Sequence, residues 1–146
     1  MTLRTLIKNA TIVNEGKSQG ANLLIENGRI AKISNAPILP SAEVADIIDA
    51  TGCFLLPGII DCHVHFREPG LTGKADIAHE SKAAAAGGVT TVFDMPNTVP
   101  QTTTLESYNE KRQLFSQKSY VNYAVFFGAT NDNLDALLTL DPETTC

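Results

Sequence analysis

The sequence predicts an α/β protein in which a small all-β module, residues 1–56, precedes strand–helix units that fill residues 57–146. Three observations support this fold class. Aliphatic and β-branched runs flank an Asn27-Gly28 turn, Pro57-Gly58 interrupts the pattern, and three apolar strand-like runs are then each followed by a helical pattern. Strands that alternate with helices over short connections indicate parallel pairing through right-handed crossovers.

The all-β module begins with a β-branched run at residues 5–13. Two further runs, residues 23–26 and 29–33, are separated by Asn27-Gly28. Both turn residues tolerate the positive φ of a type I′ turn, so this dipeptide predicts a β-hairpin. The module is expected to end with a crossing segment that contains two prolines and then a short strand: residues 36–50 and residues 52–56.

Three strand–helix units follow the Pro57-Gly58 break. Glycine can adopt the left-handed conformation that ends a helix, so Gly87-Gly88 marks the end of the first helix. The spacing from Thr103 to Glu106 is that of a capping box, and Asn131 or Asp132 could cap the third helix. The strands are expected at residues 59–66, 89–94 and 121–127, and the helices at residues 76–86, about 104–118, and through 134–138.

Two architectures remain open for these units. A closed (β/α)₈ barrel needs about 250 residues, so if the units belong to a barrel, well under half of it is present and the chain is a fragment. The alternative is a complete, small, doubly wound domain. In that case the β-rich first fifty residues would lack an obvious partner for their exposed face.

Composition excludes several classes of protein. Of the 146 residues 43% are hydrophobic and 18% charged, as in ordinary globular proteins. The net charge is -5 and the basic residues are scattered, so we expect no nucleic-acid partner. No run approaches the ~18 apolar residues of a membrane span, and no signal peptide is evident, which predicts a cytoplasmic protein without a membrane partner. Three widely spaced cysteines, Cys53, Cys62 and Cys146, indicate neither disulfides nor a zinc ribbon and are expected in or near the core.

A polar line on the first strand of the second part is the main chemical signal. Side chains two apart on a strand point the same way, from Cα atoms ~7 Å apart, so His63 and His65 could bind one cation. By the same alternation Asp61 and Arg67 share that face. A solvent-facing row of polar residues fits the motif about equally well when it is taken alone.

The position of the motif favours chemistry. In parallel α/β proteins reactive residues collect at the carboxyl ends of strands, where His63, His65 and Arg67 are expected. Asn97 follows the next strand and lies at the same end. An arginine and an asparagine that converge there would form a clamp for a carboxylate, although an asparagine after proline is also common in turns.

These residues lie in segments that resemble a known family. Residues 57–70 (PGIIDCHVHFREPG), 83–91 (AAAAGGVTT) and 94–98 (DMPNT) closely resemble the cyclic amidohydrolases of the amidohydrolase superfamily, and most of all the type I dihydroorotases. The resemblance covers nearly all of residues 52–104. It is weaker in the N-terminal strands and around residues 125–129.

The resemblance implies the start of a TIM barrel, a small β-sandwich built from both ends of the chain, and two zinc ions at the barrel mouth. His63 and His65 match the histidines that bind the more buried zinc. Arg67 and Asn97 match residues that hold the substrate carboxylate, and His65 contributes to that pocket. The bridging carboxylated lysine or aspartate, two more histidines and the catalytic aspartate are expected on strands beyond residue 146, so the chain itself contains no catalytic residue. Asp61 is either an outer-shell partner of the metal site or structural.

Arg67 and the uninterrupted Met95-Pro96-Asn97-Thr98 segment favour dihydroorotate among the substrates of similar enzymes. The predicted reaction is the reversible hydrolysis of L-dihydroorotate to N-carbamoyl-L-aspartate in pyrimidine biosynthesis. An allantoinase or hydantoinase is one alternative, and a non-catalytic homologue that acts as a scaffold is another. The scaffold has no physical need for all four intact site residues. Assembly into a homo-oligomer stays open.

Overall fold

The structure, a computed structural model, describes residues 3–39, 46–141 and 145. It divides the chain into two compact units, Met1–Pro57 and Gly58–Cys146. No helix in the described part of the chain is long and apolar enough to cross a membrane.

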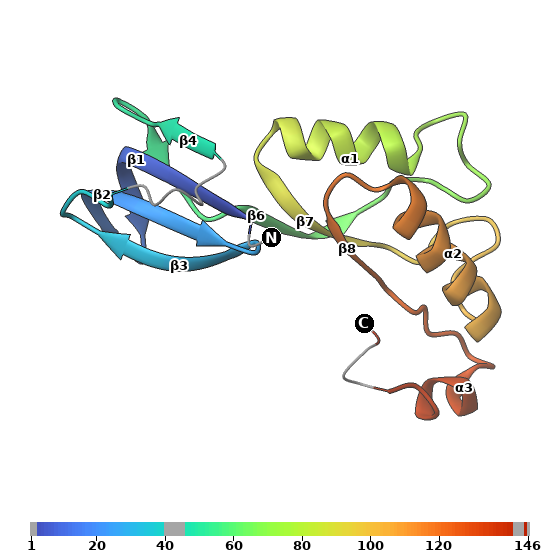
Figure 1. Ribbon diagram of the computed structural model, residues 1–146. Coiled ribbons are helices and arrows are strands. Elements are labelled where there is room, and N and C mark those ends of the chain that lie inside the picture. Colours follow the sequence, from blue (N-terminus) through green and yellow to red (C-terminus); the bar gives the residue numbers. More distant parts are fainter. Residues whose placement is uncertain (1–2, 40–45, 142–144, 146) are drawn as a thin grey trace. The chain divides into compact units, whose positions relative to one another are not determined.

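Unit 1 contains one mixed five-stranded sheet (Figure 1). Strands β1 (Arg4–Asn14), β2 (Lys17–Glu26) and β3 (Arg29–Ser34) pair antiparallel in that order. Strands β4 (Asp46–Asp49) and β5 (Phe54–Leu55) both pair parallel to β1. A small apolar cluster covers one face of the sheet, formed by Ala10, Ile12, Ala21 and Leu23.

The turns of unit 1 show what the sequence pattern could detect. The predicted hairpin at Asn27-Gly28 is confirmed, with φ of 51° and 75° and with Glu26 opposite Arg29. A second two-residue turn at Glu15-Gly16 has φ of 50° and 72° and was not predicted, because glutamate is not a typical residue for this turn. Strand β4 was also missed, since it lies within residues 36–50, the expected crossing segment.

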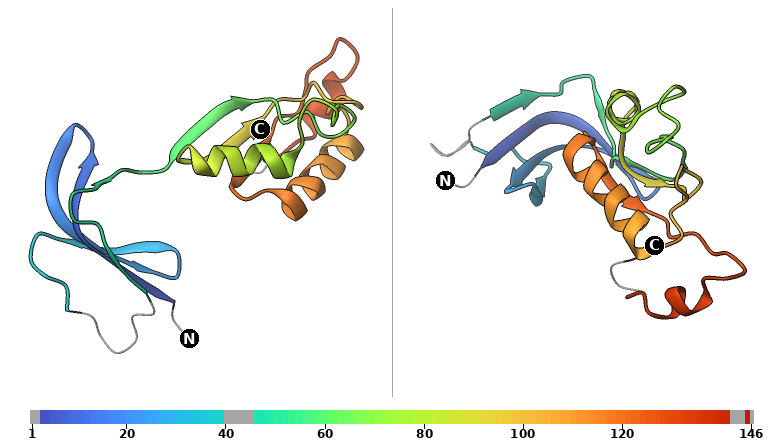
Figure 2. Two further views of the ribbon diagram at one scale, coloured as in Figure 1. Left: turned by 90° about the horizontal axis from the view of Figure 1, so that it is seen from above. Right: turned by 90° about the vertical axis from the view of Figure 1, so that its right-hand side faces the viewer.

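Unit 2 alternates strand and helix in the predicted order. Its parallel sheet has the strand order β6-β7-β8, with α1 and α2 on one face (Figures 1 and 2). The elements are β6 (Ile59–Val64), α1 (Ile77–Ala86), β7 (Val89–Asp94), α2 (Leu105–Lys118), β8 (Asn122–Val125) and α3 (Leu134–Leu138).

The main core of unit 2 lies between its sheet and its first two helices. Val92 of β7 and Val125 of β8 point toward Ile77 of α1 and Phe115 of α2, and all four are essentially inaccessible to water. Phe66, which follows β6, stacks on Phe115 with ring centroids 5.9 Å apart. The burial of these large apolar side chains fixes the layer order, and it carries the segment after β6 into the core.

Several ends of strands and helices differ from the predicted ones by one or two residues. The first strand ends at Val64 and not at residue 66. Helix α1 does end at the glycine pair, and Gly88, with φ of 85°, takes the left-handed conformation. The capping box of α2 is formed by Thr104 and Ser107, one residue later than predicted from Thr103 and Glu106.

The prediction that the cysteines lie in or near the core is wrong for the two that are described. Cys53 and Cys62 are both exposed free thiols. Cys53 immediately precedes β5, and Cys62 lies within β6, an edge strand of the sheet formed by the described residues of unit 2. Cys146 lies outside the described residues.

The cap of α2 yields the first testable prediction. The Thr104 hydroxyl accepts a hydrogen bond from the Ser107 backbone N–H at 3.2 Å, so Thr104→Ala should weaken the first turn by about 1 kcal/mol. Amide hydrogen exchange in that turn should become roughly fivefold faster. Thr103→Ala is the matched control, and equal acceleration in both variants would contradict this assignment of the cap.

Candidate functional site

The two predicted metal-ligating histidines lie at the carboxyl end of β6. His63 belongs to the strand and is exposed, whereas His65 is the first residue after it and is half-buried. Their ring centroids are 5.2 Å apart and the ring planes cross at 65°. Two imidazoles this close can share one cation, and imidazole nitrogen is a preferred ligand of zinc.

Asn97 is joined directly to this pair. His65 Nδ1 lies 2.8 Å from Asn97 Oδ1. Because an amide oxygen only accepts hydrogen bonds, Nδ1 carries the hydrogen in this arrangement, and the lone pair of the neutral ring is on Nε2. The bond therefore holds His65 in the tautomer that can bind a metal through Nε2, and it leaves the Asn97 amide group free to donate elsewhere.

The expectation that Arg67 continues the alternating face of the strand is wrong. Arg67 lies three residues past the end of β6 and has φ of 70°, the left-handed region that non-glycine residues rarely adopt. Its carbonyl accepts a hydrogen bond from Leu71 N at 3.0 Å, so the chain turns at this point. Arg67 is half-buried, and its guanidinium has no hydrogen-bond or ion-pair partner within the described part of the chain.

The neighbours of Arg67 explain this conformation. Phe66 and Glu68 are 5% and 7% exposed, so the residues on both sides of the arginine are anchored in the protein. Glu68 accepts a hydrogen bond from the backbone N–H of Ile77 at the start of α1 and forms an ion pair with Lys118 at the end of α2. These contacts hold the backbone on both sides of Arg67, and the hydrogen bond from Leu71 N to the Arg67 carbonyl closes the left-handed turn, in which Arg67 remains half-buried.

Asp61 does not share the histidine face as predicted. Asp61 lies opposite Val92 and Val64 lies opposite Asp94, so three steps along β6 match two steps along β7. This β-bulge breaks the two-residue alternation between Asp61 and His63. The Asp61 carboxylate instead accepts a hydrogen bond from the His63 backbone N–H at 3.1 Å.

Sequence reasoning missed a buried ion pair beneath the site. Asp94 ends β7, Lys111 lies in the middle of α2, and both side chains are fully buried with Asp94 Oδ2 and Lys111 Nζ 2.5 Å apart. Asp94 Oδ1 also accepts a hydrogen bond from the Phe66 backbone N–H at 2.7 Å, and Lys111 Nζ donates to the Met95 carbonyl at 2.7 Å. Burial lowers the pKa of Lys111, and the negative charge of Asp94 opposes that shift. The only sequence signal is that Lys111 falls on the buried stripe of α2 between Tyr108 and Phe115.

The two loops that carry the site residues also contact each other. Val99 N donates to the Pro69 carbonyl at 3.2 Å, and Gly70, with φ of 81°, lies against the Val99 backbone. Within the second loop, the Thr98 and Thr102 backbone N–H groups both donate to the Pro96 carbonyl. Asn97 is therefore presented by a compact loop that packs on the loop of Arg67.

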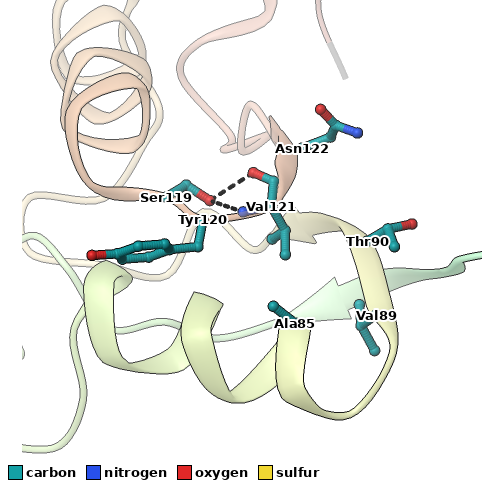
Figure 3. A pocket seen from close by; sticks show the side chains of 7 residues that line it. All are labelled: Ala85, Val89, Thr90, Ser119, Tyr120, Val121 and Asn122. Carbon is teal, nitrogen blue, oxygen red and sulfur yellow. Dashed lines mark hydrogen bonds between the residues drawn. The ribbon is translucent and has the colours of Figure 1, made fainter. Parts of the chain in front are cut away.

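One cleft of unit 2, of about 470 Å³, lies away from these residues, beside the beginnings of β7 and β8, the amino ends of these strands (Figure 3). In parallel α/β proteins, ligands bind outside the carboxyl ends. The side chains that line it are those of Ala85, Val89, Thr90, Ser119, Tyr120, Val121 and Asn122, and the Ser119 hydroxyl is engaged by the Val121 backbone (Figure 3).

The metal-ligand set is partial within this chain. Among residues 3–39, 46–141 and 145, no group of three or more His, Cys, Asp or Glu side chains is placed to hold a metal ion. A zinc site in proteins takes at least three protein ligands. His63 and His65 therefore fit part of such a site and need further ligands.

Comparison with known proteins identifies the family. The family model described as dihydro-orotase-like matches residues 52–133, more than half of the chain. The chain belongs to the dihydroorotase-like family. The matched span includes all the candidate site residues, from His63 to Asn97.

Curated relatives of this dihydroorotase-like chain carry the name dihydroorotase. The protein from Methanosarcina acetivorans is 44% identical over 134 residues, which cover 92% of this chain and 28% of the relative. The protein from Staphylococcus aureus is 40% identical and covers 88% of this chain and 30% of the relative. The chain thus spans less than a third of the length of these relatives.

Among solved structures, an L-hydantoinase (dihydropyrimidinase) from Arthrobacter aurescens matches with a TM-score of 0.85 and 33% identity, over 94% of this chain and 30% of that one. A D-hydantoinase matches with a TM-score of 0.77 and 31% identity, over 92% of this chain and 30% of that one. The α/β arrangement described above is therefore shared with hydantoinases.

The contact between the loops yields the second prediction. A Cβ at Gly70 would lie 2.1 Å from the Val99 carbonyl oxygen, at a φ that alanine disfavours by about 1 to 2 kcal/mol. Gly70→Ala should lower the melting temperature by several degrees through overpacking and backbone strain. Gly73→Ala, in the same loop, meets nothing within 4 Å and should melt like the unmodified protein. Equal melting temperatures for the two variants would contradict the packing described.

Proposed function

We propose that the whole protein is a zinc-dependent dihydroorotase, which reversibly hydrolyses L-dihydroorotate to N-carbamoyl-L-aspartate in cytoplasmic pyrimidine biosynthesis. The observation that carries the proposal is the bond between His65 and Asn97 at 2.8 Å, which joins a metal-ligating side chain to a carboxylate-binding one. The relatives named dihydroorotase support the same activity.

The proposal includes the larger architecture. Residues 57–146 would form the first three strand–helix units of a TIM barrel, and residues 1–56 part of a β-sandwich. The parallel order β6-β7-β8, with helices on one face, is what the start of a barrel requires. The single mixed sheet of unit 1 would supply one layer of the sandwich.

His63 and His65 would hold the more buried of two zinc ions, with the remaining ligands supplied by later strands. When bound, zinc lowers the pKa of a coordinated water toward ~7 and polarises a carbonyl oxygen, which is the chemistry that ring opening of a cyclic amide needs. His65 meets the donor requirement because its Nδ1 is engaged by Asn97. Proton transfer to the leaving nitrogen falls to an aspartate outside this chain.

Arg67 and Asn97 would bind the ring carboxylate. The Arg67 guanidinium has no partner in the described part of the chain, and its two-pronged geometry matches a carboxylate. The Asn97 amide nitrogen remains available after its oxygen has bonded to His65. His65 would have both roles, since it would hold zinc and also contact the substrate.

A hydantoinase is the second candidate, favoured by the 0.85 TM-score to an L-hydantoinase. The two candidates differ in the need for a carboxylate-binding residue. A neutral cyclic amide gives an unpaired, half-buried arginine nothing to bind, whereas dihydroorotate gives it a charged partner. Arg67 therefore favours dihydroorotase.

The metal assignment is tested with histidine variants of the whole protein. His63→Ala or His65→Ala should lower the zinc content, measured by atomic absorption, and abolish turnover of dihydroorotate, because each removes a ligand. His79→Ala is the control, since the ring of that exposed histidine is bonded to Asp76 at the start of α1, away from the site. Full zinc content and activity in both site variants would place the metal elsewhere.

The substrate assignment is tested with Arg67→Met. Loss of a charged hydrogen bond in a desolvated pocket should cost about 2 to 4 kcal/mol, or roughly 30-fold to 1000-fold in kcat/KM for dihydroorotate. Zinc content should not change, and any activity on dihydrouracil, which lacks the carboxylate, should be largely spared.

Lys74→Met removes an exposed cation from the same loop and should leave both activities as they are. If Arg67→Met reduces both activities equally, the arginine supports the site generally. The reaction would then be that of an unspecified cyclic amidohydrolase.

A further inference from the structure

We propose that Asp94 and Lys111 are positioning residues, a buried ion pair that holds the two substrate-binding loops in place before substrate arrives. This inference rests on the proposed function for the identity of the substrate. The placement of the loops by the pair can be tested independently of that identity.

Each member of the pair has a second contact, and each of these contacts is to the backbone of a different site loop. Asp94 accepts from the Phe66 N–H at 2.7 Å, and Phe66 lies between His65 and Arg67. Lys111 donates to the Met95 carbonyl at 2.7 Å, two residues before Asn97. One interaction of two side chains therefore fixes a backbone atom in each of the two loops that carry Arg67 and Asn97.

The location of the pair makes it a rigid reference for both loops. The two side chains are fully buried and 2.5 Å apart. The backbone of Asp94 is also tied to the next strand, because its carbonyl accepts from Phe126 N at 3.0 Å. Asp94 thus joins the segments that follow β6, β7 and β8, and Lys111 connects this junction to α2.

Stability does not account for a pair in this position. The desolvation of two charges cancels most of their attraction, so apolar residues of similar volume are often equally stabilising. Apolar replacements, however, could neither accept from the Phe66 N–H nor donate to the Met95 carbonyl. If the pair is only structural, apolar replacement of both residues should restore both stability and substrate binding. If the pair positions the loops, the replacement should restore stability but not substrate binding.

The test uses Asp94→Val, Lys111→Met and the double variant in the whole protein. Either single variant leaves a buried charge without its partner and should melt well below the unmodified protein. The double variant should melt above either single variant. Its KM for dihydroorotate should stay raised by roughly 10-fold to 100-fold with a much smaller change in kcat, since substrate binding depends on the loops. A double variant that regains both the melting temperature and KM would overturn the proposal.

Hydrogen exchange in the unmodified, substrate-free protein provides a second test that needs no variant. If the pair positions the loops in advance, the Phe66 amide should exchange as slowly as that of Val92 in the centre of β7. Exchange as fast as that of Gly73, in the exposed part of the loop, would also overturn the proposal. Failure of the unmodified protein to hydrolyse dihydroorotate would reject the proposed function, while the exchange result would still decide whether the loops are held.

Discussion

The arrangement of the candidate site depends on a buried ion pair between Asp94 and Lys111. Most of the core around it is apolar, formed by side chains such as Val92 and Phe115 that fix the layers but not the loops. Apolar packing is non-directional, whereas a carboxylate and an ammonium impose distances and angles on the groups they bind. The directional contacts lie where the strands end, and they hold backbone groups one or two residues into each loop, Met95 after β7 and Phe66 after β6.

The anchoring of Phe66 and Glu68 follows from the same junction. Once the Phe66 N–H is bound to Asp94, its ring enters the core beside Phe115, and Glu68 reaches the start of α1. The chain also turns at this point, since the Arg67 carbonyl accepts a hydrogen bond from Leu71 N, a contact that an extended strand could not make. Arg67 adopts a left-handed φ in this turn, which costs about 1 to 2 kcal/mol. The buried contacts on either side offset this strain.

The sequence was informative where a signal is local. The Asn27-Gly28 hairpin, the strand–helix alternation and the positions of His63 and His65 at a strand end all depend on neighbouring residues, and periodicity detects them. The β-bulge after Asp61 and the turn at Arg67 involve partners far away in the sequence, such as Asp94, which binds the Phe66 N–H 28 residues away, so two-residue alternation placed both residues incorrectly. Lys111 was overlooked because a lysine on a helix is expected in solvent unless a buried carboxylate is known to lie opposite it.

The proposed metal ligand His63 and the proposed carboxylate-binding residue Arg67 have different structural supports in this chain. His63 is placed by the sheet itself, because it belongs to β6 and its backbone N–H is held by Asp61. Arg67 is placed by loop contacts that the sheet does not determine, namely those of Phe66 and Glu68. Changes in those contacts can move the arginine while the register of β6 and the position of His63 stay as they are. The chain has the same sheet as the hydantoinases that its fold matches, while its curated relatives are named dihydroorotase. Loops that are held independently of the sheet are consistent with this combination, because they can differ while the sheet stays the same.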